Sequence, residues 1–497
     1  MPLAPLERSE TIFAPATGFG RAAVSVVRIC GPAAGPALDA LAGRRPEPRR
    51  LSLRRLRDPA SGTLLDQALV AWLPGPGTAT GEDMAELHLH GGTAVRAAVL
   101  RALGALPGCR PAEAGAFTRR AFLNGRLDLT EAEGIADLID AETEAQRLQA
   151  LRQLDGALGR QVAAWRDTAI DLLASAEAAL DFADEGDVDD TGLDAALTGR
   201  AASLSKEIRK ILADGRRGER LREGFCVVLA GPPNSGKSTL LNALAGRDAA
   251  IVSDIPGTTR DAIEVRCDLG GLPVVLIDTA GLRDAIDPIE AEGVARTRRR
   301  IETADLVLRL LPIDAPEPDR DGGPATLWVR TKSDLAPNAV AQTDPDRAPV
   351  PLPLAGRGRG GGGSGSSVMV PSAPPPPPPS SLQEGGERPV RSPGAASDAL
   401  RISAHTGAGL DALLDAIQRQ AEASLGGDAL VTRERHRDAL TRAVAHLDRV
   451  AAAPPDHLPE LTAEDLRLAV RALGEVGGHV GVEEMLDRLF AGFCIGK

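Results

Sequence analysis

Hydrophobic positions change their spacing along the chain, and each change marks the start of a predicted domain. Residues 10–124 alternate short apolar runs, such as "AAVSVVRI" and "AELHLH", with glycine and proline, and include one helical stretch, "TAVRAAVLRALGAL". Short apolar runs between turn residues are typical of strands. The pattern therefore predicts a small α/β domain over residues 1–124.

A helical pattern replaces it over residues 125–218. Apolar side chains recur there at steps of three and four, with almost no proline, at Leu151, Leu154, Leu158, Val162 and Trp165. This spacing predicts long helices whose apolar stripe forms a bundle core. The pattern is helical again over residues 426–497. Each segment is short for a domain that folds on its own, so we expect the two to form one discontinuous helical domain.

The segment between them, residues 219–425, has a different pattern. Strand-like runs such as "FCVVLAG", "LPVVLIDTAG" and "ATLWVRTKSD" alternate with helical stretches, which is typical of a doubly wound, largely parallel sheet. The predicted fold class is therefore α/β plus α, with a nucleotide-type domain inserted into the helical one.

One part of this inserted domain, at about residues 340–398, cannot form a core. It contains "GRGRGGGGSGSS" and "APPPPPPSS", which offer little apolar surface to offset the loss of chain entropy. We expect a flexible insertion with a stiff polyproline stretch. A polyproline II site that binds a partner is the alternative.

Composition narrows the class of protein. The net charge of −12 argues against polyanion binding by the whole chain, although a local basic patch is compatible with it. No apolar run approaches the ~18 residues of a membrane span, and no export signal is recognised. The five cysteines are widely spaced and form no CxxC pair, so neither a disulfide framework nor a zinc site is indicated. We expect a cytoplasmic protein with no membrane partner.

The strongest chemical signal is "GPPNSGKS" at residues 231–238. It matches G-x4-G-K-[ST] between a strand-like run and a helical one, as a phosphate-binding loop requires. Glycines let backbone N–H groups surround phosphate oxygens, Lys237 neutralises the β and γ phosphates, and Ser238 can bind Mg²⁺. The predicted nucleotide-binding residues of this loop are Asn234, Ser235, Gly236, Lys237, Ser238 and Thr239.

Further motifs follow in the order that a GTPase uses. "GTTRD" offers Thr259 as a switch threonine that closes over Mg²⁺ and the γ-phosphate, and "DTAG" offers Asp278 and Gly281. In "TKSD", Asp334 can accept two hydrogen bonds from guanine, a pair of donors that adenine lacks. The predicted base-binding residues are Lys332, Asp334, Ser403 and Ala404, the last two in "SAHTG".

Two positions depart from the usual GTPase pattern. Thr331 stands where GTPases usually have asparagine, which ties the base site to the phosphate loop. Threonine has a shorter reach and a single hydroxyl, so we expect it to loosen nucleotide affinity. Leu282 follows "DTAG" where a Ras-like protein has a water-orienting glutamine, so another group must position the water and supply charge in the transition state.

Together with the GTPase motifs, four other stretches make the chain similar to one family. They are "GRAAVSVVRICGP", "GEDMAELHLHGG", "AFTRRAFLNGRLDLTEAEGIADLIDAET" and the terminal "FCIGK". The chain resembles the MnmE (TrmE) family of bacterial tRNA modification GTPases over nearly its whole length outside the insertion. The resemblance implies an N-terminal α/β domain that dimerises and binds a one-carbon tetrahydrofolate, a helical domain made of two segments, and an inserted Ras-like GTPase domain.

The resemblance also implies a folate site. Its contacts fall on Arg28, Glu86, Arg126 and the terminal Lys497, with 5-formyl- or 5,10-methylene-tetrahydrofolate as the ligand. The family usually has lysine at the position of Arg126, and the two cations differ in geometry. By the same resemblance, Cys494 acts in the modification chemistry.

A catalytic cation is implied by the resemblance as well. K⁺ bound between two dimerised GTPase domains would replace the positive charge of an arginine finger. The implied K⁺ ligands are Asn234, Ser253, Ile255 and Thr258, and Ser253 also belongs to the nucleotide site; Mg²⁺ would be held by Ser238 and Thr259. The implied catalytic residues are Thr258, Thr259, Glu290, which positions the attacking water, and Cys494.

The cysteine of "FCIGK" leaves three possibilities. A prenylation signal is disfavoured because Gly496 and Lys497 fit neither the aliphatic nor the terminal position. An inert tail and an element of the active site are the others. Reactivity of Cys494 is indicated by the resemblance, since an unpaired cysteine is most often a small buried hydrophobe.

For function, the resemblance implies a homodimer that assembles with FAD-binding MnmG (GidA) into a heterotetramer. Together they would add an aminomethyl or carboxymethylaminomethyl group to C5 of the wobble uridine of certain tRNAs, with glycine or ammonium as the amine source. One alternative is a ribosome-assembly or signalling GTPase that modifies nothing. Another is a folate-dependent aminomethyl transferase with a vestigial GTPase domain.

Overall fold

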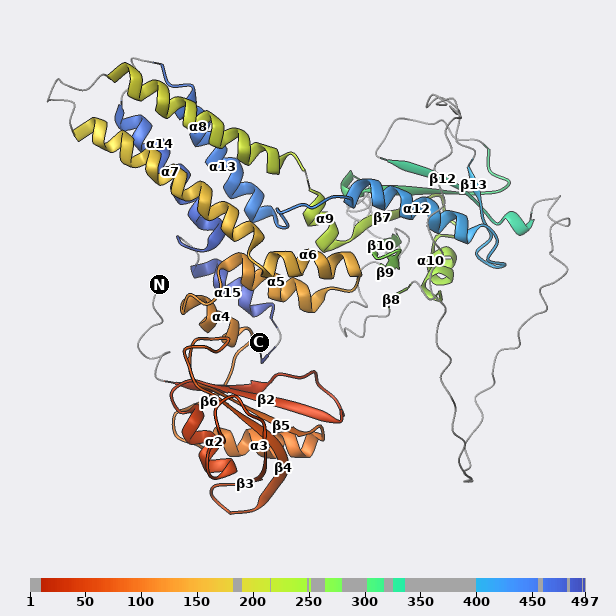
Figure 1. Ribbon diagram of the computed structural model, residues 1–497. Helices are drawn as coiled ribbons and strands as arrows, with labels where there is room; N and C mark the ends of the chain where they lie inside the picture. Colours follow the sequence, from red (N-terminus) through yellow and green to blue (C-terminus); the bar gives the residue numbers. More distant parts are fainter. Residues whose placement is uncertain are drawn as a thin grey trace, which may run out of the picture.

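The structure is a computed structural model. It describes residues 10–181, 190–214, 216–247, 250–251, 264–278, 302–316, 325–335, 399–454, 459–480, 483–493 and 495–496. Figure 1 shows a sheet domain built from the N-terminal residues, a helical bundle, and a second sheet domain beside the bundle. Helices α5 and α6 lie where the three parts meet.

The N-terminal domain is a six-stranded sheet in the order β3-β4-β5-β2-β1-β6. Neighbouring strands are antiparallel, except that β1 and β6 are parallel. The strands are β1 (Thr11–Pro15), β2 (Val24–Cys30), β3 (Ser52–Arg57), β4 (Leu64–Leu73), β5 (Met84–His90) and β6 (Cys109–Pro111).

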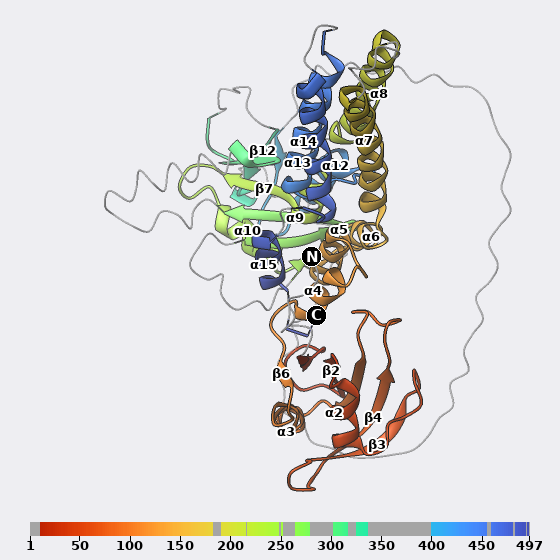
Figure 2. The ribbon, with the colours of Figure 1, turned by 90° about the vertical axis from the view of Figure 1, so that its left-hand side faces the viewer.

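The two faces of this sheet differ. Helices α2 (Ala34–Ala42) and α3 (Thr93–Gly104) cover one face, where Val27, Leu87 and their neighbours form a buried core. Figure 2 shows both helices on the same side of the strands. The alternation of side chains along β2 and β5 sends Arg28 and Glu86 to the opposite face. The predicted α/β class of this part of the chain is confirmed.

The opposite face is covered only in part. Helix α4 (Ala116–Leu123) packs Phe117 against Ile12, Cys30 and Met84. Farther along the same face Leu53 and Leu69 are cross-strand partners, and they stay 56% and 41% exposed.

The helical part combines segments from before and after the inserted domain. Helices α7 (Ala157–Asp181), α8 (Asp190–Leu212), α13 (Glu434–Ala451) and α14 (Pro459–Gly477) pack as a bundle, with Trp165, Leu204, Leu440 and Leu473 among its buried residues. The predicted helical class is confirmed. The remaining helices of this part, α5 (Leu129–Asp140), α6 (Glu144–Leu154) and α15 (Glu483–Ala491), lie between the bundle and the N-terminal domain.

The apolar stripe predicted over Leu151–Trp165 is broken in the structure. Leu158, Val162 and Trp165 are buried in the bundle core, whereas Leu151 and Leu154 are only half-buried and belong to α6. A turn with Gly156 at a φ of 74° separates α6 from α7. The apolar periodicity continues across this turn because apolar residues recur at steps of three and four in both helices.

The inserted domain is a seven-stranded sheet in the order β13-β12-β11-β7-β10-β9-β8. Strands β7, β10, β11, β12 and β13 are parallel, and β9 and β8 continue the sheet antiparallel, so the mostly parallel α/β class is confirmed. The strands are β7 (Phe225–Ala230), β8 (Ala250–Ile251), β9 (Glu264–Leu269), β10 (Leu272–Asp278), β11 (Leu306–Pro312), β12 (Thr326–Thr331) and β13 (Leu400–Arg401).

The helices in the described part of this domain are α9 (Arg217–Glu223), α10 (Lys237–Ala245) and α12 (Leu410–Leu425), with a 3-10 turn, η3 (Ser333–Leu335). The carboxyl ends of β7, β10 and β12 meet at one edge of the sheet, which is where open α/β sheets bind ligands. The predicted insertion at about residues 340–398 lies outside the described residues, so its flexibility stays a prediction. Within the described part of the chain, no helix combines the length and apolar character needed to cross a membrane.

Candidate functional site

The phosphate loop connects β7 to α10. Its two left-handed residues are Asn234, with a φ of 61°, and Gly236, with a φ of 90°, directly before the helix. Gly231 must be small, because a Cβ there would lie 2.4 Å from the carbonyl oxygen of Leu310 on β11. The loop therefore turns tightly against the sheet and presents the N-terminus of α10, which favours an anion.

Lys237 is held inside this loop. Its Nζ donates to the carbonyl oxygens of Gly231 at 3.1 Å and Pro232 at 3.0 Å, and the residue is buried. Ser235 beside it is fully buried, while Asn234, Ser238 and Thr239 are exposed. The ammonium group thus lies on the inner side of the loop, where a bound phosphate chain would need its charge.

Ser238 and Asp278 meet across the edge of the sheet. The Ser238 hydroxyl donates to Oδ2 of Asp278 at 2.7 Å, and Asp278 is buried at the end of β10. A serine hydroxyl and a nearby carboxylate are oxygen ligands of the kind that Mg²⁺ prefers, directly or through water. The donor set therefore fits a magnesium ion beside the phosphate loop.

Thr331 joins the base loop to the phosphate loop despite its short side chain. Its hydroxyl donates to the buried carbonyl oxygen of Ser235 at 2.7 Å, from the end of β12. Threonine can make this contact because β12 ends close to the loop, so a longer asparagine side chain is not needed. The structural link is kept with threonine, and the expected loosening of nucleotide affinity stays a prediction.

The loop after β12 forms the candidate base site. Lys332 has a φ of 59°, and Asp334 follows on η3. A hydrogen bond from the buried Ser403 is the main cause that lowers the pKa of Asp334, which keeps the carboxylate ionised and able to accept. Ala404 is half-buried beside the domain core. The structure thus brings the "TKSD" and "SAHTG" segments together.

Other predicted residues of this site lie outside the described part of the chain. They are Ser253, Ile255, Thr258, Thr259, Gly281 and Glu290. The predicted K⁺ site, the switch threonine and the water-positioning glutamate therefore stay predictions.

A second group of candidate residues lies on the N-terminal sheet. Arg28 and Glu86 are cross-strand partners on β2 and β5, with Arg28 Nε 3.2 Å from Glu86 Oε1. His88 Nε2 lies 3.5 Å from the other carboxylate oxygen, and the Arg28 guanidinium lies 5.8 Å from the centre of the Phe117 ring. Both charged side chains remain about one quarter exposed, so they can contact a ligand.

Arg126 lies close to this sheet, but within the described part of the chain no hydrogen bond joins it to Glu86. Its side-chain Cγ would lie 3.3 Å from a Cβ on Gly81, in the loop before β5, and the side chain is exposed. The sequence motifs placed Arg28, Glu86 and Arg126 in one site; the structure places all three on the side of the domain that α4 borders.

The sequence analysis did not identify two charged residues of this region, Arg120 and Glu82. Arg120 of α4 donates to Oε2 of Glu82 at 2.7 Å and to the carbonyl oxygen of Glu10 at 2.9 Å, and Asn124 donates to the other oxygen of Glu82 at 3.2 Å. Arg120 lies in "AFTRRAFLNGR" and Glu82 in "GEDMAEL", but nothing in the spacing of these motifs indicates that the two side chains pair. Burial raises the pKa of the Cys30 thiol, beside this cluster, to about 12, which disfavours the reactive thiolate form.

The described residues of the C-terminal tail pack against the N-terminal domain. Phe490 and Phe493 contact each other, with ring centres 5.5 Å apart, and are buried with Leu129 of α5. Ile495 forms an antiparallel bridge with Ala114, and a Cβ on Gly496 would lie 1.9 Å from the carbonyl oxygen of Pro15 on β1.

The tail is thus docked beside β1, whose Ala14 pairs with Arg28. Cys494 and Lys497 lie outside the described residues, so their roles stay predictions. The structure does not bring the folate candidates and the phosphate loop together, because they lie in different domains with α5 and α6 between them (Figure 1). Among the residues that the structure describes, no group of three or more His, Cys, Asp or Glu side chains could hold a metal ion.

Comparison with known proteins gives matches over nearly the whole chain. A family model described as the MnmE helical domain matches residues 129–494, and one described as the GTP-binding protein TrmE N-terminus matches residues 11–126. A protein of Methylorubrum populi named tRNA modification GTPase MnmE is 72% identical over 99% of this chain and 98% of its own length.

Proteins with the same name from two other organisms are also similar to this chain. The one from Methylobacterium radiotolerans is 63% identical over 99% of this chain and all of its own length. The one from Rhodospirillum rubrum is 49% identical over 98% of this chain and 99% of its own length.

Proposed function

Because the chain belongs to the MnmE family of tRNA modification GTPases, we propose that it hydrolyses GTP and takes part in modifying the wobble uridine of tRNA. With an FAD-binding partner of the MnmG type, it adds an aminomethyl or carboxymethylaminomethyl group to C5 of that uridine. The amine comes from glycine or ammonium. The observation that carries the GTPase part is the convergence of Lys237, Ser238 and Asp278 at one edge of the sheet.

GTP is the proposed nucleotide because of the base loop. Asp334 is kept ionised beside Ser403, and an ionised carboxylate accepts two hydrogen bonds from guanine. Asn234, Ser235, Gly236 and Thr239 complete the phosphate side, while Lys332 and Ala404 flank the base. Ser238 and Thr259 hold Mg²⁺, which neutralises phosphate charge.

Hydrolysis needs other groups to position the water and to supply charge in the transition state, because no glutamine follows "DTAG". K⁺ bound by Asn234, Ser253, Ile255 and Thr258 supplies that charge when two GTPase domains meet, and Glu290 positions the water. The exposed, left-handed Asn234 supports this proposal, since its side chain is available at the surface where a second domain would approach.

The N-terminal domain is the proposed site of a one-carbon tetrahydrofolate, in the 5-formyl or 5,10-methylene form, which supplies the carbon unit. Arg28 and Arg126 pair with anionic groups of the ligand, and Glu86 accepts hydrogen bonds from its pterin ring. The partial exposure of the Arg28–Glu86 pair supports this role. Cys494 and Lys497 flank the docked residues Ile495 and Gly496 in the sequence, and we assign them to the same site.

The chain acts as a homodimer in this proposal. Leu53 and Leu69 form an exposed apolar pair on the same sheet face as Arg28 and Glu86, and a second copy that covers this pair would place two folate sites near one interface. In this proposal the homodimer assembles with the FAD-binding partner into a heterotetramer, and this complex binds the tRNA. The net charge of −12 supports a division of labour in which the partner supplies much of the tRNA contact.

The test is nucleotide hydrolysis by the purified full chain. We expect GTP to be hydrolysed and ATP not, with a rate in K⁺ at least tenfold above that in Na⁺ and loss of activity in Lys237→Ala. Lys210→Ala, a change of a lysine on α8 outside the GTPase domain, is the matched control. Hydrolysis of ATP at the same rate, or equal rates for Lys237→Ala and wild type, would overturn the proposal.

A further inference from the structure

The GTPase domain is joined to the helical part by two chain crossings, residues 217–224 and 426–433, called here the junction. The crossings are bonded to each other. Arg222 Nε donates to the carbonyl oxygen of Thr432 at 3.2 Å, and Arg217 Nη1 donates to that of Gly426 at 3.3 Å. Hydrogen bonds therefore tie the two chain crossings to each other.

Helix α6 binds this junction through amide side chains. Gln146 Nε2 donates to the carbonyl oxygen of Arg222 at 3.1 Å, and the Thr432 hydroxyl donates to Oε1 of Gln153 at 2.7 Å. Gln153 in turn donates to the carbonyl oxygen of Thr130 on α5 at 3.1 Å. The polar contacts thus run without a break from the junction to α5.

The start of α6 also touches the GTPase domain directly. The backbone N–H of Ala145 donates to the carbonyl oxygen of Gly271, in the turn between β9 and β10, at 3.1 Å. Arg266 on β9 donates to Glu142 at 3.3 Å. Strand β10 ends at Asp278, which contacts Ser238 of the phosphate loop, so the far end of the same strand carries the nucleotide site.

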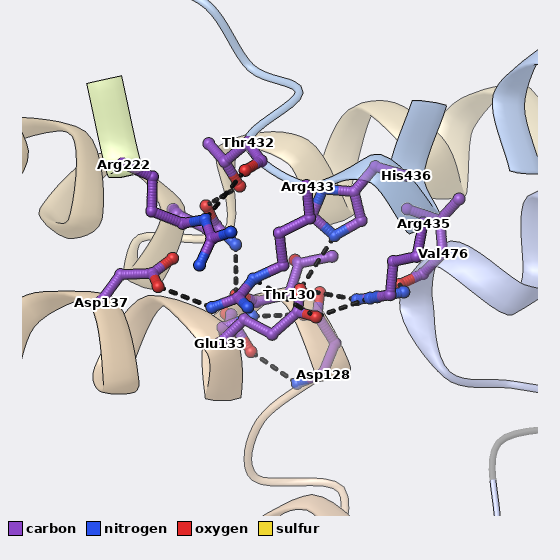
Figure 3. A network of polar contacts seen from close by, with 12 residues as sticks. Asp128, Thr130, Glu133, Asp137, Arg222, Thr432, Arg433, Arg435, His436 and Val476 are labelled. Atoms are coloured by element: carbon purple, nitrogen blue, oxygen red, sulfur yellow. Dashed lines mark hydrogen bonds and ion pairs between the residues drawn. The ribbon is translucent and has the colours of Figure 1, made fainter. Parts of the chain in front are cut away.

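Helix α5 is locked to the chain just beyond the junction by a buried charge cluster, which Figure 3 shows. Arg435 donates to both oxygens of Glu133 at 2.5 and 2.6 Å, and His436 Nε2 lies 2.8 Å from Oε2. The Glu133 side chain is 3% exposed and that of His436 is fully buried. One turn along α5, Asp137 accepts from Arg433 at 2.6 Å.

A buried carboxylate is tolerated only with its partners in good geometry, so this cluster fixes both the rotation and the position of α5 against the junction. Apolar packing would hold the helix without specifying its rotation so closely. The placement of Glu133 in the middle of α5 lets the junction control the whole helix.

The other end of α5 lies at the candidate folate site. Arg126 precedes the helix by three residues, and Asp128 caps its first turn. Leu129 and Ala132 pack against Phe490 and Phe493 below the docked tail. A shift of α5 therefore moves both the loop that carries Arg126 and the surface on which the tail rests.

We propose that α5 couples the nucleotide state of the GTPase domain to the candidate folate site, and that Glu133 is the positioning residue of this coupling. The inference rests on the proposed function and adds the element and the side chains that carry the signal. Glu133 touches neither nucleotide nor folate; it acts through α5. Coupling of this kind is a reciprocal change in two affinities, which a purely structural ion pair does not produce.

The test measures the affinity of the full chain for 5-formyltetrahydrofolate twice, once with GDP and once with a non-hydrolysable GTP analogue and Mg²⁺. We expect the two dissociation constants of the wild type to differ by about fivefold or more, the usual lower size of such coupling. In Glu133→Gln, which has the same shape without the charge, the ratio falls to about one while both ligands still bind.

Asp448→Asn is the matched control. Asp448, an acid on α13, also accepts hydrogen bonds from another helix, from Ser205 and Arg209 of α8, but it lies in the bundle away from the junction. The ratio of its two dissociation constants for 5-formyltetrahydrofolate should equal that of the wild type. Should Glu133→Gln not fold, as judged by its melting transition, Asp137→Asn decides, with a reduced ratio expected.

The outcomes separate the two proposals. A wild-type ratio of one, with folate binding and GTP hydrolysis both present, overturns the coupling and leaves the proposed function standing. An unchanged ratio in the folded Glu133 or Asp137 variant overturns the role of the cluster. Absence of folate binding or of GTP hydrolysis in the wild type overturns the proposed function itself.

Discussion

At the scale of single residues, Thr331 joins the base loop to the phosphate loop with one hydroxyl. Removing that hydroxyl leaves the buried carbonyl of Ser235 without this donor, which costs about 1 to 3 kcal/mol. We expect Thr331→Val to weaken GDP binding by about tenfold in a fluorescent-nucleotide titration. Thr331→Ser keeps the hydroxyl and should bind as the wild type does; equal affinities for Val and Ser would show that the contact does not support the site.

Asp137 gives a prediction about pH. Burial is the main cause that raises its pKa to about 6, with Glu133 and Asp140 adding to the effect against Arg433 and Arg222. In the unfolded chain the pKa is about 3.9, so between pH ~4 and ~6 the native state binds more protons than the unfolded state. The free energy of unfolding contributed by this group therefore falls as pH rises through that window and stays low above it.

Asp137→Asn removes this titration. Relative to the variant, we expect the wild type to lose roughly 2 to 3 kcal/mol of unfolding free energy between pH ~4 and ~6.5, measured by urea denaturation. Glu133 is unchanged in both proteins; burial opposes its charge, but His436 and Arg435 outweigh burial and lower its pKa, so its own loss of stability comes only at more acidic pH. A difference that does not vary with pH would contradict the prediction.

At the scale of elements, the C-terminal tail depends on a glycine. Gly496 has a φ of 103°, and a Cβ there would meet the carbonyl oxygen of Pro15 at 1.9 Å. Gly496→Ala must therefore displace the tail from β1. We expect affinity for 5-formyltetrahydrofolate to fall by about tenfold or more, equivalent to ~1.4 kcal/mol, with GTP hydrolysis within about twofold of the wild type.

Gly492→Ala is the control for this change, because the nearest atom to its Cβ, the carbonyl oxygen of Leu489, lies at 3.5 Å. It should bind folate normally. Equal folate affinities for the two alanine variants and the wild type would mean that the docked tail plays no part in the folate site.

The elements that sequence predicted well are those defined by local rules. The phosphate loop follows from consecutive residues, and the strands of both sheets follow from short apolar runs. The contact of Thr331 with Ser235 could not be predicted, because 96 residues separate the two partners and only the pairing of β12 beside β11 brings them together. Periodicity alone also failed at the turn between α6 and α7.

The charge cluster was missed for the same physical reason. Glu133 reads as an ordinary acid on a helix, and Arg435 and His436 lie about 300 residues away in sequence. Only the return of the chain from the GTPase domain places them side by side. Burial of a charged residue is a tertiary property, and it is not visible in the local pattern.

At the scale of the whole molecule, the exposed pair Leu53 and Leu69 predicts how two copies meet. Leu53→Glu combined with Leu69→Glu places two charges on that face and should convert a dimer into a monomer in sedimentation equilibrium, because burying unpaired carboxylates is costly. Leu461→Glu, a change of a 50% exposed leucine at the start of α14, is the control and should leave the dimer intact. A double variant that stays dimeric would place the interface elsewhere.

The arrangement of the parts also explains why one chain would hold both sites. The candidate nucleotide site and the candidate folate site lie in different domains, with α5 and α6 between them (Figure 1). A GTPase used only as a switch would not need the Arg28–Glu86 pair or a tail docked beside it.

The measurement that tests this account most directly is mass spectrometry of wobble-uridine nucleosides in tRNA from the source organism, with and without this chain. The account predicts that 5-aminomethyl-type nucleosides disappear without the chain and return with the wild type and with Asp448→Asn, but not with Lys237→Ala. An unchanged nucleoside profile in the absence of the chain would contradict the account and favour a GTPase that modifies no tRNA.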